Sequence, residues 1–217
     1  MLKGVIFDMD GVLIDSHPIH KRAWRKFFAS LGLEVSESEL DFVLDGRKKE
    51  DILRHFLGDL PDTAIRDYGH RKEMLFREEA LAIATIDGAL EFLEQLGDAG
   101  IDFALASCGS HSRVHYILRR LNIHDHFAAI VTADDVQHGK PHPEIFQKAA
   151  GKLGRSCCEI LVIEDAVSGV KAARAAGMKC IGIGDQQRAE ELMQAGAERV
   201  LPNFLQTSVH DVSVLFA

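Results

Sequence analysis

Two aspartates that could do chemistry follow the first apolar run of the chain. Residues 5–7 read Val-Ile-Phe, Asp8 and Asp10 come after them, and Gly11 completes a turn sequence. A short buried strand that ends in a tight turn would present both carboxylates at one edge of a sheet. Two carboxylates so close together repel each other unless a cation lies between or beside them. The pair therefore points to a site that holds a cation.

A second acidic pair, Glu164 and Asp165, follows the apolar run at residues 160–163. In an open parallel sheet, ligands bind beyond the carboxyl ends of the strands, so the two acidic pairs could lie close together. Oxygen ligands that converge in this way suit a hard cation such as Mg²⁺, which shares its coordination sphere with substrate phosphate. Metal-assisted phosphoryl transfer is therefore the leading interpretation.

A hydroxyl and a lysine complete the set that this chemistry needs. Ser107 follows the apolar run at 103–106, where its hydroxyl and neighbouring N–H groups could bind phosphate oxygens at a helix N-terminus. Lys140 precedes Pro141, which biases the lysine toward an extended conformation. A lysine held on such a loop can neutralise charge on a carboxylate nucleophile and on a transferring phosphoryl group.

Each of these features also has an ordinary structural explanation. Asp-x-Asp-Gly is a common turn sequence, Ser107 could cap the following helix, and Lys140 could be a solvated loop residue. Glu164 and Asp165 could favour the positive start of the next helix. Co-location favours the chemical interpretation, because separate strand ends together supply a nucleophile, a metal site, a hydroxyl and a cation.

Short apolar runs that alternate with helical patterns indicate the elements that would position these residues. In the clearest helical pattern, Val114, Ile117 and Leu118 share one face with Leu121. The predicted strands are 5–7, 103–106, 129–131, 160–163 and 180–183. Strands alternating with helices predict an α/β fold with a Rossmann-like, doubly wound parallel sheet.

The interval between the first two predicted strands is unusually long. Residues 16–82 contain no convincing strand and several charged helical stretches, and a crossover of that length is too large for one helix. We predict an inserted α-helical cap domain at 16–82, hinged near 14–16 and near 82–84. The catalytic core is then predicted to consist of residues 1–15 and 83–217.

The composition excludes several classes of function. The 217 residues, 47% hydrophobic and 27% charged, are typical of a soluble globular protein, and no apolar run is long enough to span a bilayer. A net charge of −8 would repel nucleic acid, and no Lys/Arg-dense stripe is evident in the sequence to reverse this locally. The early acidic residues interrupt any signal peptide, which favours the cytoplasm. We expect a small phosphorylated metabolite as ligand, no membrane partner, and a monomer or weak homodimer.

The cysteines and several histidines are assigned to no metal. The four cysteines contain no spaced C-x-x-C pair, which favours reduced thiols over a zinc site. His124 and His126 receive the same interpretation. So do His138 and His142, because Pro141 would break any helix that aligned them.

Four segments resemble, in order, the signature motifs of the haloacid dehalogenase superfamily. They are Phe7–Ser16, Ser107, Lys140–Pro143 and Ile163–Gly169. The resemblance implies a Rossmann-like core with a helical cap, and catalysis through an aspartyl-phosphate intermediate. It also implies that Ser107 and Lys140 hold the transferring phosphoryl group.

The same resemblance assigns roles to the acidic pairs. Asp8 would be the nucleophile and a metal ligand, and Asp10 the general acid/base, which also binds the metal through its carbonyl. Glu164 and Asp165 would complete the Mg²⁺ site. Because Asp10 is an aspartate, the chain departs from the dehalogenase and phosphonatase branches, which lack it at that position.

Part of the predicted cap resembles the β-phosphoglucomutase branch. His20 and Trp24 are four residues apart on a predicted helix and share a face, and the segment 46–51 also matches. In that branch the equivalent histidine bonds to the acid/base aspartate, and a basic residue matching Lys49 binds the remote phosphate. Lys72 matches a cap lysine that could face the cleft. Ordinary alternatives are core packing for the first two and solvation for the lysines.

The chain departs from the mutase pattern at the residues that would bind a second phosphate. The mutases carry Arg where this chain has Lys49, and a Lys-Asn pair where it has Ser110 and His111. A bidentate guanidinium and a second cation are thus replaced by a point charge and weaker donors. A Mg²⁺-dependent phosphatase is therefore the first interpretation and a sugar phosphomutase the alternative. A catalytically inactive binding module on the same fold is a third.

Overall fold

A six-stranded parallel sheet forms the centre of the protein in the computed structural model, which describes residues 1–217 apart from the side chain of residue 82. The strand order is β3-β2-β1-β4-β5-β6. The strands are β1 (Gly4–Phe7), β2 (Asp102–Ala106), β3 (Ala129–Val131), β4 (Ile160–Glu164), β5 (Lys179–Ile183) and β6 (Arg199–Leu201). The predicted α/β fold and its five strands are confirmed. The sequence does not predict β6, because only two of its three residues are apolar.

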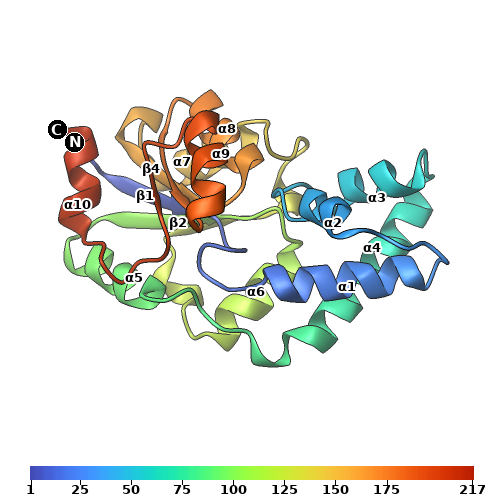
Figure 1. Ribbon diagram of the computed structural model, residues 1–217. Coiled ribbons are helices and arrows are strands. Elements are labelled where there is room, and N and C mark those ends of the chain that lie inside the picture. Colours follow the sequence, from blue (N-terminus) through green and yellow to red (C-terminus); the bar gives the residue numbers. More distant parts are fainter.

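Helices cover both faces of the sheet (Figure 1). Val5 and Phe7 of β1 point into one hydrophobic cluster, whereas Ile6 points into another, so the strand is buried on both sides. The first cluster includes side chains of α5 (Ala89–Asp98), α6 (His111–Arg120) and α10 (Val209–Ser213). The second includes side chains of α7 (Glu144–Leu153), α8 (Val167–Ala175) and α9 (Gln186–Ala195). Short 3₁₀ helices lie at Ala80–Ala82, His124–His126, Ala133–Asp135, Cys157–Glu159 and Val214–Phe216.

The segment between β1 and β2 is helical and has a hydrophobic cluster of its own. It contains α1 (His17–Ala29), α2 (Glu37–Val43), α3 (Lys49–Leu57) and α4 (Asp62–Glu79), which lie to the right of the sheet in Figure 1. Trp24, Phe27 and Phe28 of α1 pack there against side chains of α2, α3 and α4. These aromatic residues recur on one face of α1, which is why the helix can bury that face away from the sheet.

The two connections between this helical segment and the sheet run side by side. Ile14 forms an antiparallel bridge with Thr85, and the Asp15 N–H donates to the Ala84 carbonyl at 2.9 Å. These contacts lie at the two hinges expected from the sequence, although the side chain of residue 82 is outside the described part. The division into a core (1–15 and 83–217) and a cap domain (16–82) stays a prediction.

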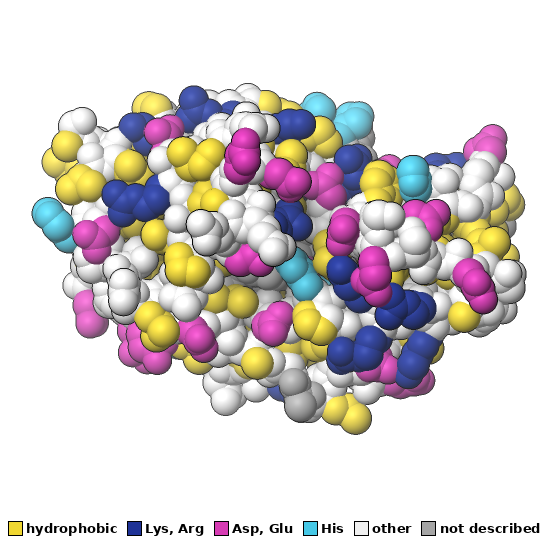
Figure 2. All heavy atoms as spheres, viewed as in Figure 1, with side chains coloured by type: hydrophobic (Ala, Val, Ile, Leu, Met, Phe, Trp, Pro, Cys, Tyr) yellow, Lys and Arg dark blue, Asp and Glu magenta, His cyan; other side chains and the backbone are white. Residues whose placement is uncertain are grey.

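Basic side chains do gather on one helix, contrary to what the sequence suggests. Figure 2 shows dark blue side chains grouped where α1 lies in Figure 1, and α1 carries Lys21, Arg22, Arg25 and Lys26. Each of the four forms an ion pair with Glu37, Asp41 or Glu79. The acidic partners offset part of this local positive charge. No helix in the described part of the chain is both long and apolar enough to cross a membrane.

Candidate active site

A cleft between the carboxyl edge of the sheet and the helical segment holds most of the predicted site residues. It encloses about 730 Å³, including its open mouth, which is within the size range of small-molecule sites. Its lining includes Asp8, Asp10, His20, Trp24, Lys49, Lys72, Ser110 and Asp165. Lys140 and Glu164 are buried directly beside Asp8.

Asp8 lies at the end of β1, where the chain leaves the sheet. Its N–H donates to the Ile163 carbonyl at 2.9 Å, so the residue is still fixed by the neighbouring strand β4. One carboxylate oxygen accepts the Asp10 N–H at 2.8 Å and the other accepts the Lys140 ammonium at 2.5 Å. Burial raises the pKa of Asp8 to about 7, although Lys140 opposes the shift. A cation bound beside the carboxylate would favour its ionised form.

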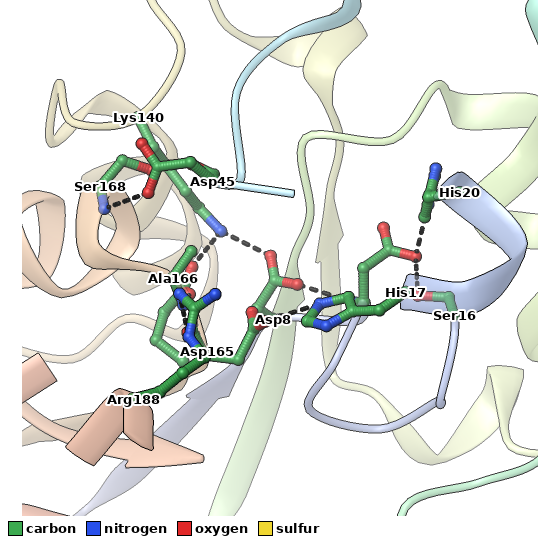
Figure 3. A network of polar contacts seen from close by, with 12 residues as sticks. Asp8, Ser16, His17, His20, Asp45, Lys140, Asp165, Ala166, Ser168 and Arg188 are labelled. Atoms are coloured by element: carbon green, nitrogen blue, oxygen red, sulfur yellow. Dashed lines mark hydrogen bonds and ion pairs between the residues drawn. The ribbon is translucent and has the colours of Figure 1, made fainter. Parts of the chain in front are cut away.

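Lys140 connects the two predicted acidic pairs. Its buried ammonium donates to Asp8, to Glu164 and to the Ala106 carbonyl, and Figure 3 shows it between Asp8 and the loop that carries Ala166. Burial opposes the charge, but Asp8 and then Glu164 hold the pKa of Lys140 well above its usual range. The lysine is therefore a fixed positive charge beside the candidate nucleophile.

Glu164 is predicted to be a direct metal ligand, and its contacts bear on that prediction. One of its oxygens accepts from Lys140, and the other accepts the N–H groups of Asp165 and Ala166 at 2.9 Å each. With both oxygens engaged in this way, the side chain holds Lys140 and the loop after β4. This arrangement favours Asp8 and Asp165 over Glu164 as direct ligands.

Asp165 offers the oxygen that best fits a hard cation. Its Oδ2 atom is buried and lies 2.8 Å from His17 Nε2, but it accepts no well-directed hydrogen bond in the described part of the protein. Burial raises the pKa of Asp165, and the charge of Asp8 adds to the effect. A Cβ atom on Gly11, where φ is +73°, would lie 2.4 Å from that oxygen, so the turn leaves room only for glycine. Two buried carboxylates that repel each other, Asp8 and Asp165, are oxygen donors that fit Mg²⁺.

His17 joins the site without having been predicted. Although burial opposes it, the close contact with Asp165 and the charge of that carboxylate raise the pKa of His17. His17 is the first residue of α1, directly after the turn that carries the two aspartates. The sequence gives no spacing signal for it, because its contact with Asp165 depends on how β1 and β4 pair.

Asp10 is held by donors from the helical segment and from α6. Its carboxylate accepts from Ser16 Oγ at 2.7 Å and from His20 Nε2 at 3.1 Å. Arg113 forms a two-pronged ion pair with it, at 2.8 and 2.7 Å. Burial opposes ionisation, but Arg113 and then His20 hold the pKa of Asp10 well below its usual range.

Arg113 is a second residue of the site that the sequence analysis does not predict. It lies in the first turn of α6 and is 5% exposed. It precedes Ile117 by four residues and therefore lies on the apolar face of the helix. A charged residue on an apolar helix face is the signal that could have found it, since such a residue stays buried only when it is paired.

His20 links Asp10 to Lys72. Its Nδ1 atom lies 2.9 Å from the Lys72 ammonium, and burial followed by the charge of Lys72 lowers the pKa of His20 to about 3. A neutral ring can accept from Lys72 at Nδ1 and donate to Asp10 from Nε2. Burial and then Arg113 lower the pKa of Lys72 to about 7.

The remaining cap residues are divided between the cleft and the cap core. Lys49 begins α3 and its ammonium lies 3.9 Å from a Glu73 carboxylate oxygen in the cleft. Trp24 reaches the cleft wall, where Lys72 lies 5.1 Å from its ring, but it is 1% exposed and packs against Phe28. Core packing therefore accounts for most of the Trp24 side chain.

The residues that follow β2 do not all face the cleft, because α6 begins among them. Ser107 is buried and its Oγ accepts the Gly109 N–H at 3.1 Å, whereas the residue at the helix N-cap is Ser110. Ser107 therefore does not cap the helix. The Ser110 hydroxyl oxygen is buried at the cleft and has no hydrogen-bond partner in the described part of the protein. His111 is not brought to the cleft, because it lies on the outer face of α6 with its ring 4.0 Å from that of His115.

The loop that carries Lys140 brings His138 and His142 together without a helix. Their ring centroids lie 4.6 Å apart, and Glu144 joins them. Pro141 therefore does not keep the two histidines apart, because a loop can align them as well as a helix can. The Glu144 carboxylate already accepts the N–H groups of Gln137 and His138, so it acts as a cap for this loop.

Comparison with known proteins places this site in a family. The model of the haloacid dehalogenase-like hydrolase family matches residues 2–177. Hexitol phosphatase A from Escherichia coli (strain K12) is 34% identical over 183 residues, covering 83% of this chain and 82% of that protein. Beta-phosphoglucomutase from Bacillus subtilis (strain 168) is 33% identical over 200 residues, covering 86% of this chain and 85% of that protein.

A solved structure agrees in fold over nearly the whole chain. The crystal structure of a CbbY mutant from Rhodobacter sphaeroides, in complex with xylulose-(1,5)bisphosphate, superimposes with a TM-score of 0.85. The two proteins are 26% identical, and the match covers 97% of this chain and 98% of the other. The family match, the two relatives and this shared fold agree with the residues that meet in the cleft, and the chain belongs to the haloacid dehalogenase-like hydrolase family.

Proposed function

We propose that the protein is a Mg²⁺-dependent phosphatase that removes phosphate from a small phosphorylated metabolite, a sugar phosphate above all, through an aspartyl-phosphate at Asp8. One observation carries the proposal: the Asp8 carboxylate lies at a strand end in contact with the buried Lys140 ammonium. A carboxylate attacks a phosphate ester only when nearby cations reduce the charge on the phosphoryl group. The hexitol phosphatase relative supports a polyol or sugar phosphate as substrate.

The residues of the cleft can divide the reaction into two steps. In the first step the Asp8 carboxylate attacks phosphorus and the bond from phosphorus to the leaving oxygen breaks. Asp10, which must leave its ion pair with Arg113 and take up a proton from solvent for this step, gives that proton to the leaving oxygen. In the second, water attacks the same phosphorus, Asp10 takes a proton from the water, and the bond to Asp8 breaks to release inorganic phosphate. Ser107 and Lys140 would hold the phosphoryl oxygens meanwhile. Mg²⁺ bound by Asp8, Asp165 and the Asp10 carbonyl would offset the negative charge of these groups.

The helical segment at 16–82 would close the cleft as a cap. Ser168 after β4 donates its N–H to Asp45 at 3.1 Å, and Lys48 donates to the Val136 carbonyl at 3.0 Å. These bonds join the loop before α3 to the core. Closure of this kind would exclude bulk water from the phosphoenzyme.

A sugar phosphomutase is the second candidate, because a mutase is among the relatives of similar identity. A mutase must bind the second phosphate firmly enough for a sugar hydroxyl to outcompete water. Lys49 is a point charge where the mutases carry arginine, and His111 lies outside the cleft. This pattern favours hydrolysis.

The deciding experiment follows both products together. The enzyme with Mg²⁺ receives β-glucose 1-phosphate and a trace of the 1,6-bisphosphate, and free phosphate and glucose 6-phosphate are measured. We expect phosphate as the main product. Isomerisation that outruns phosphate release by a hundredfold would establish the mutase instead. Absence of hydrolysis of both this substrate and a generic aryl phosphate would favour the inactive binding module.

A further inference from the structure

Arg113 occupies a place in the cleft that the proposed phosphatase reaction does not explain. Its guanidinium is 6% exposed, pairs with both carboxylate oxygens of Asp10, and lies 5.0 Å from the centre of the Phe76 ring. Packing against an aromatic ring and pairing on two atoms fix its orientation. The side chain is therefore a placed cation inside the substrate cleft.

Asp10, the partner of Arg113, is the general acid/base of the proposed reaction. Among the described residues, the side chains that contact the Asp10 carboxylate are those of Ser16, His20 and Arg113. They come from the start of the helical segment or from α6. An acid/base group for an ester bound at Asp8 has to point toward the leaving oxygen beside Asp8. Asp10 must then give up part of its contact with Arg113.

Once Asp10 turns, the surroundings of Arg113 are short of negative charge. The nearest other carboxylate is Glu73, 4.0 Å from Arg113 Nε, and Glu73 also faces Lys49 at 3.9 Å. Lys72 lies on the same wall and has no carboxylate oxygen within 4.0 Å among the residues that the structure describes. Glu73 is thus shared by Lys49 and Arg113, and Glu50, which also lines the cleft, lies farther than 4.0 Å from all three cations among the described residues. A buried charge left without a partner is costly.

The shortage of negative charge around Arg113 indicates a class of substrate, and this inference rests on the proposed function. We propose that Arg113 is a specificity-determining residue that binds a second anionic group, a carboxylate or a phosphate, on the leaving group of the substrate. The planar fork that now holds the Asp10 carboxylate has the geometry to hold either anion by two hydrogen bonds. The buried Ser110 hydroxyl at the same end of α6 is a further donor. Exchange of one anion for another would couple substrate binding to the release of Asp10.

The test uses three matched open-chain substrates with the Mg²⁺-loaded enzyme: an alditol 6-phosphate, the corresponding aldonic acid 6-phosphate, and the alditol 1,6-bisphosphate. They differ only in the group at carbon 1, which is neutral, a carboxylate or a phosphate. We expect at least one anionic substrate to exceed the neutral one about tenfold in kcat/KM. Hydrogen bonds to charged groups predict that Arg113→Met lowers kcat/KM for that substrate roughly 10- to 100-fold more than for the neutral one.

Two variants separate specificity from folding and from simple positioning of Asp10. Arg113→Lys keeps the charge but not the fork, so it should retain part of the preference. Arg119→Met removes a charge from the exposed side of the same helix and should leave the preference unchanged. No preference for an anion in the wild type, or an equal loss on all three substrates in Arg113→Met, would overturn the proposal.

A binding measurement keeps this inference distinct from the proposed function. Calorimetry with Asp8→Asn protein and the same three compounds reports affinity without turnover. Tighter binding of an anionic compound, lost in Asp8→Asn/Arg113→Met, supports the role of Arg113 even if the wild type hydrolyses nothing. Equal affinities for all three compounds would refute it even if the wild type is an active phosphatase.

Discussion

Two buried lysines on opposite sides of the cleft have their pKa values shifted in opposite directions. Lys140, on the side of the sheet, has a pKa held well above its usual range because it contacts Asp8 and Glu164. Lys72, on the side of the helical segment, has a pKa lowered to about 7 because it is buried near Arg113, with a histidine as its hydrogen-bond partner. Both are less than 5% exposed, so exposure does not explain the difference.

The two lysines differ in whether the chain itself supplies carboxylates to pair with them. Around Lys140, the chain supplies its own counter-charges, the carboxylates of Asp8 and Glu164, and leaves an excess of negative charge that a metal cation would offset. Around Lys72 and Arg113, positive charge exceeds negative charge, and an anionic group of the substrate would restore the balance. In this proposal, the residues on the side of the sheet carry out phosphoryl transfer. The residues on the side of Lys72 and Arg113 select the substrate.

The largest effect is expected from the nucleophile. Asp8→Asn should lower phosphate release by at least about 1,000-fold, because the amide cannot attack phosphorus and removes a charge from the metal site. Release of phosphate from an aryl ester measures this. Asp102→Asn, an exposed residue at the start of β2, is the matched control and should keep wild-type activity. Activity of Asp8→Asn within tenfold of wild type would contradict the assignment.

Removal of the metal should act on the same side of the cleft. EDTA should abolish turnover, and added Mg²⁺ should restore it, because buried carboxylates repel one another without a cation. Mg²⁺ should also raise the Tm of the wild type but not that of Asp165→Asn. Full activity in metal-free buffer, or rescue by zinc but not by magnesium, would refute the hard-cation interpretation.

Asp10→Ala should produce a smaller loss, roughly 10²- to 10⁴-fold, which is typical of general acid–base steps. Rapid-quench measurements should show slower formation and slower breakdown of the phosphoenzyme. Asp15→Ala changes an exposed aspartate in the same turn region and serves as the control. If only breakdown slowed, Asp10 would act as a base and not also as an acid.

The sequence predicts the residues at the strand ends better than those that reach the site from α1 and α6. The acidic pairs and Ser107 follow apolar runs, and the carboxyl ends of parallel strands meet at one edge, so their convergence follows from local patterns. His17 and Arg113 were missed because their contacts depend on strand pairing and on the rotation of α6 about its axis. The same rotation takes His111 out of the cleft, although it lies next to Ser110 in the sequence.

The cap side can also be tested without a substrate, through the stability of the folded protein. Lys72 has a pKa of about 7 in the fold, against 10.5 for an ordinary lysine. Between these values the unfolded chain binds more protons than the folded one, so the free energy of unfolding rises with pH. The cost of burying Lys72 is complete below pH 7 and disappears as the pH approaches 10.5.

Lys72→Met should remove this pH dependence, because methionine fills similar space without a charge. Urea unfolding at pH 7 and pH 9 should show a rise of about 2 kcal/mol in the wild type that is absent from Lys72→Met. Lys171→Met removes an exposed lysine from α8 and should keep the wild-type rise. An equal rise in wild type and Lys72→Met would mean that the ammonium is balanced by the protein itself. The contrast with Lys140 would then fail, and with it the argument that this side of the cleft awaits an anion.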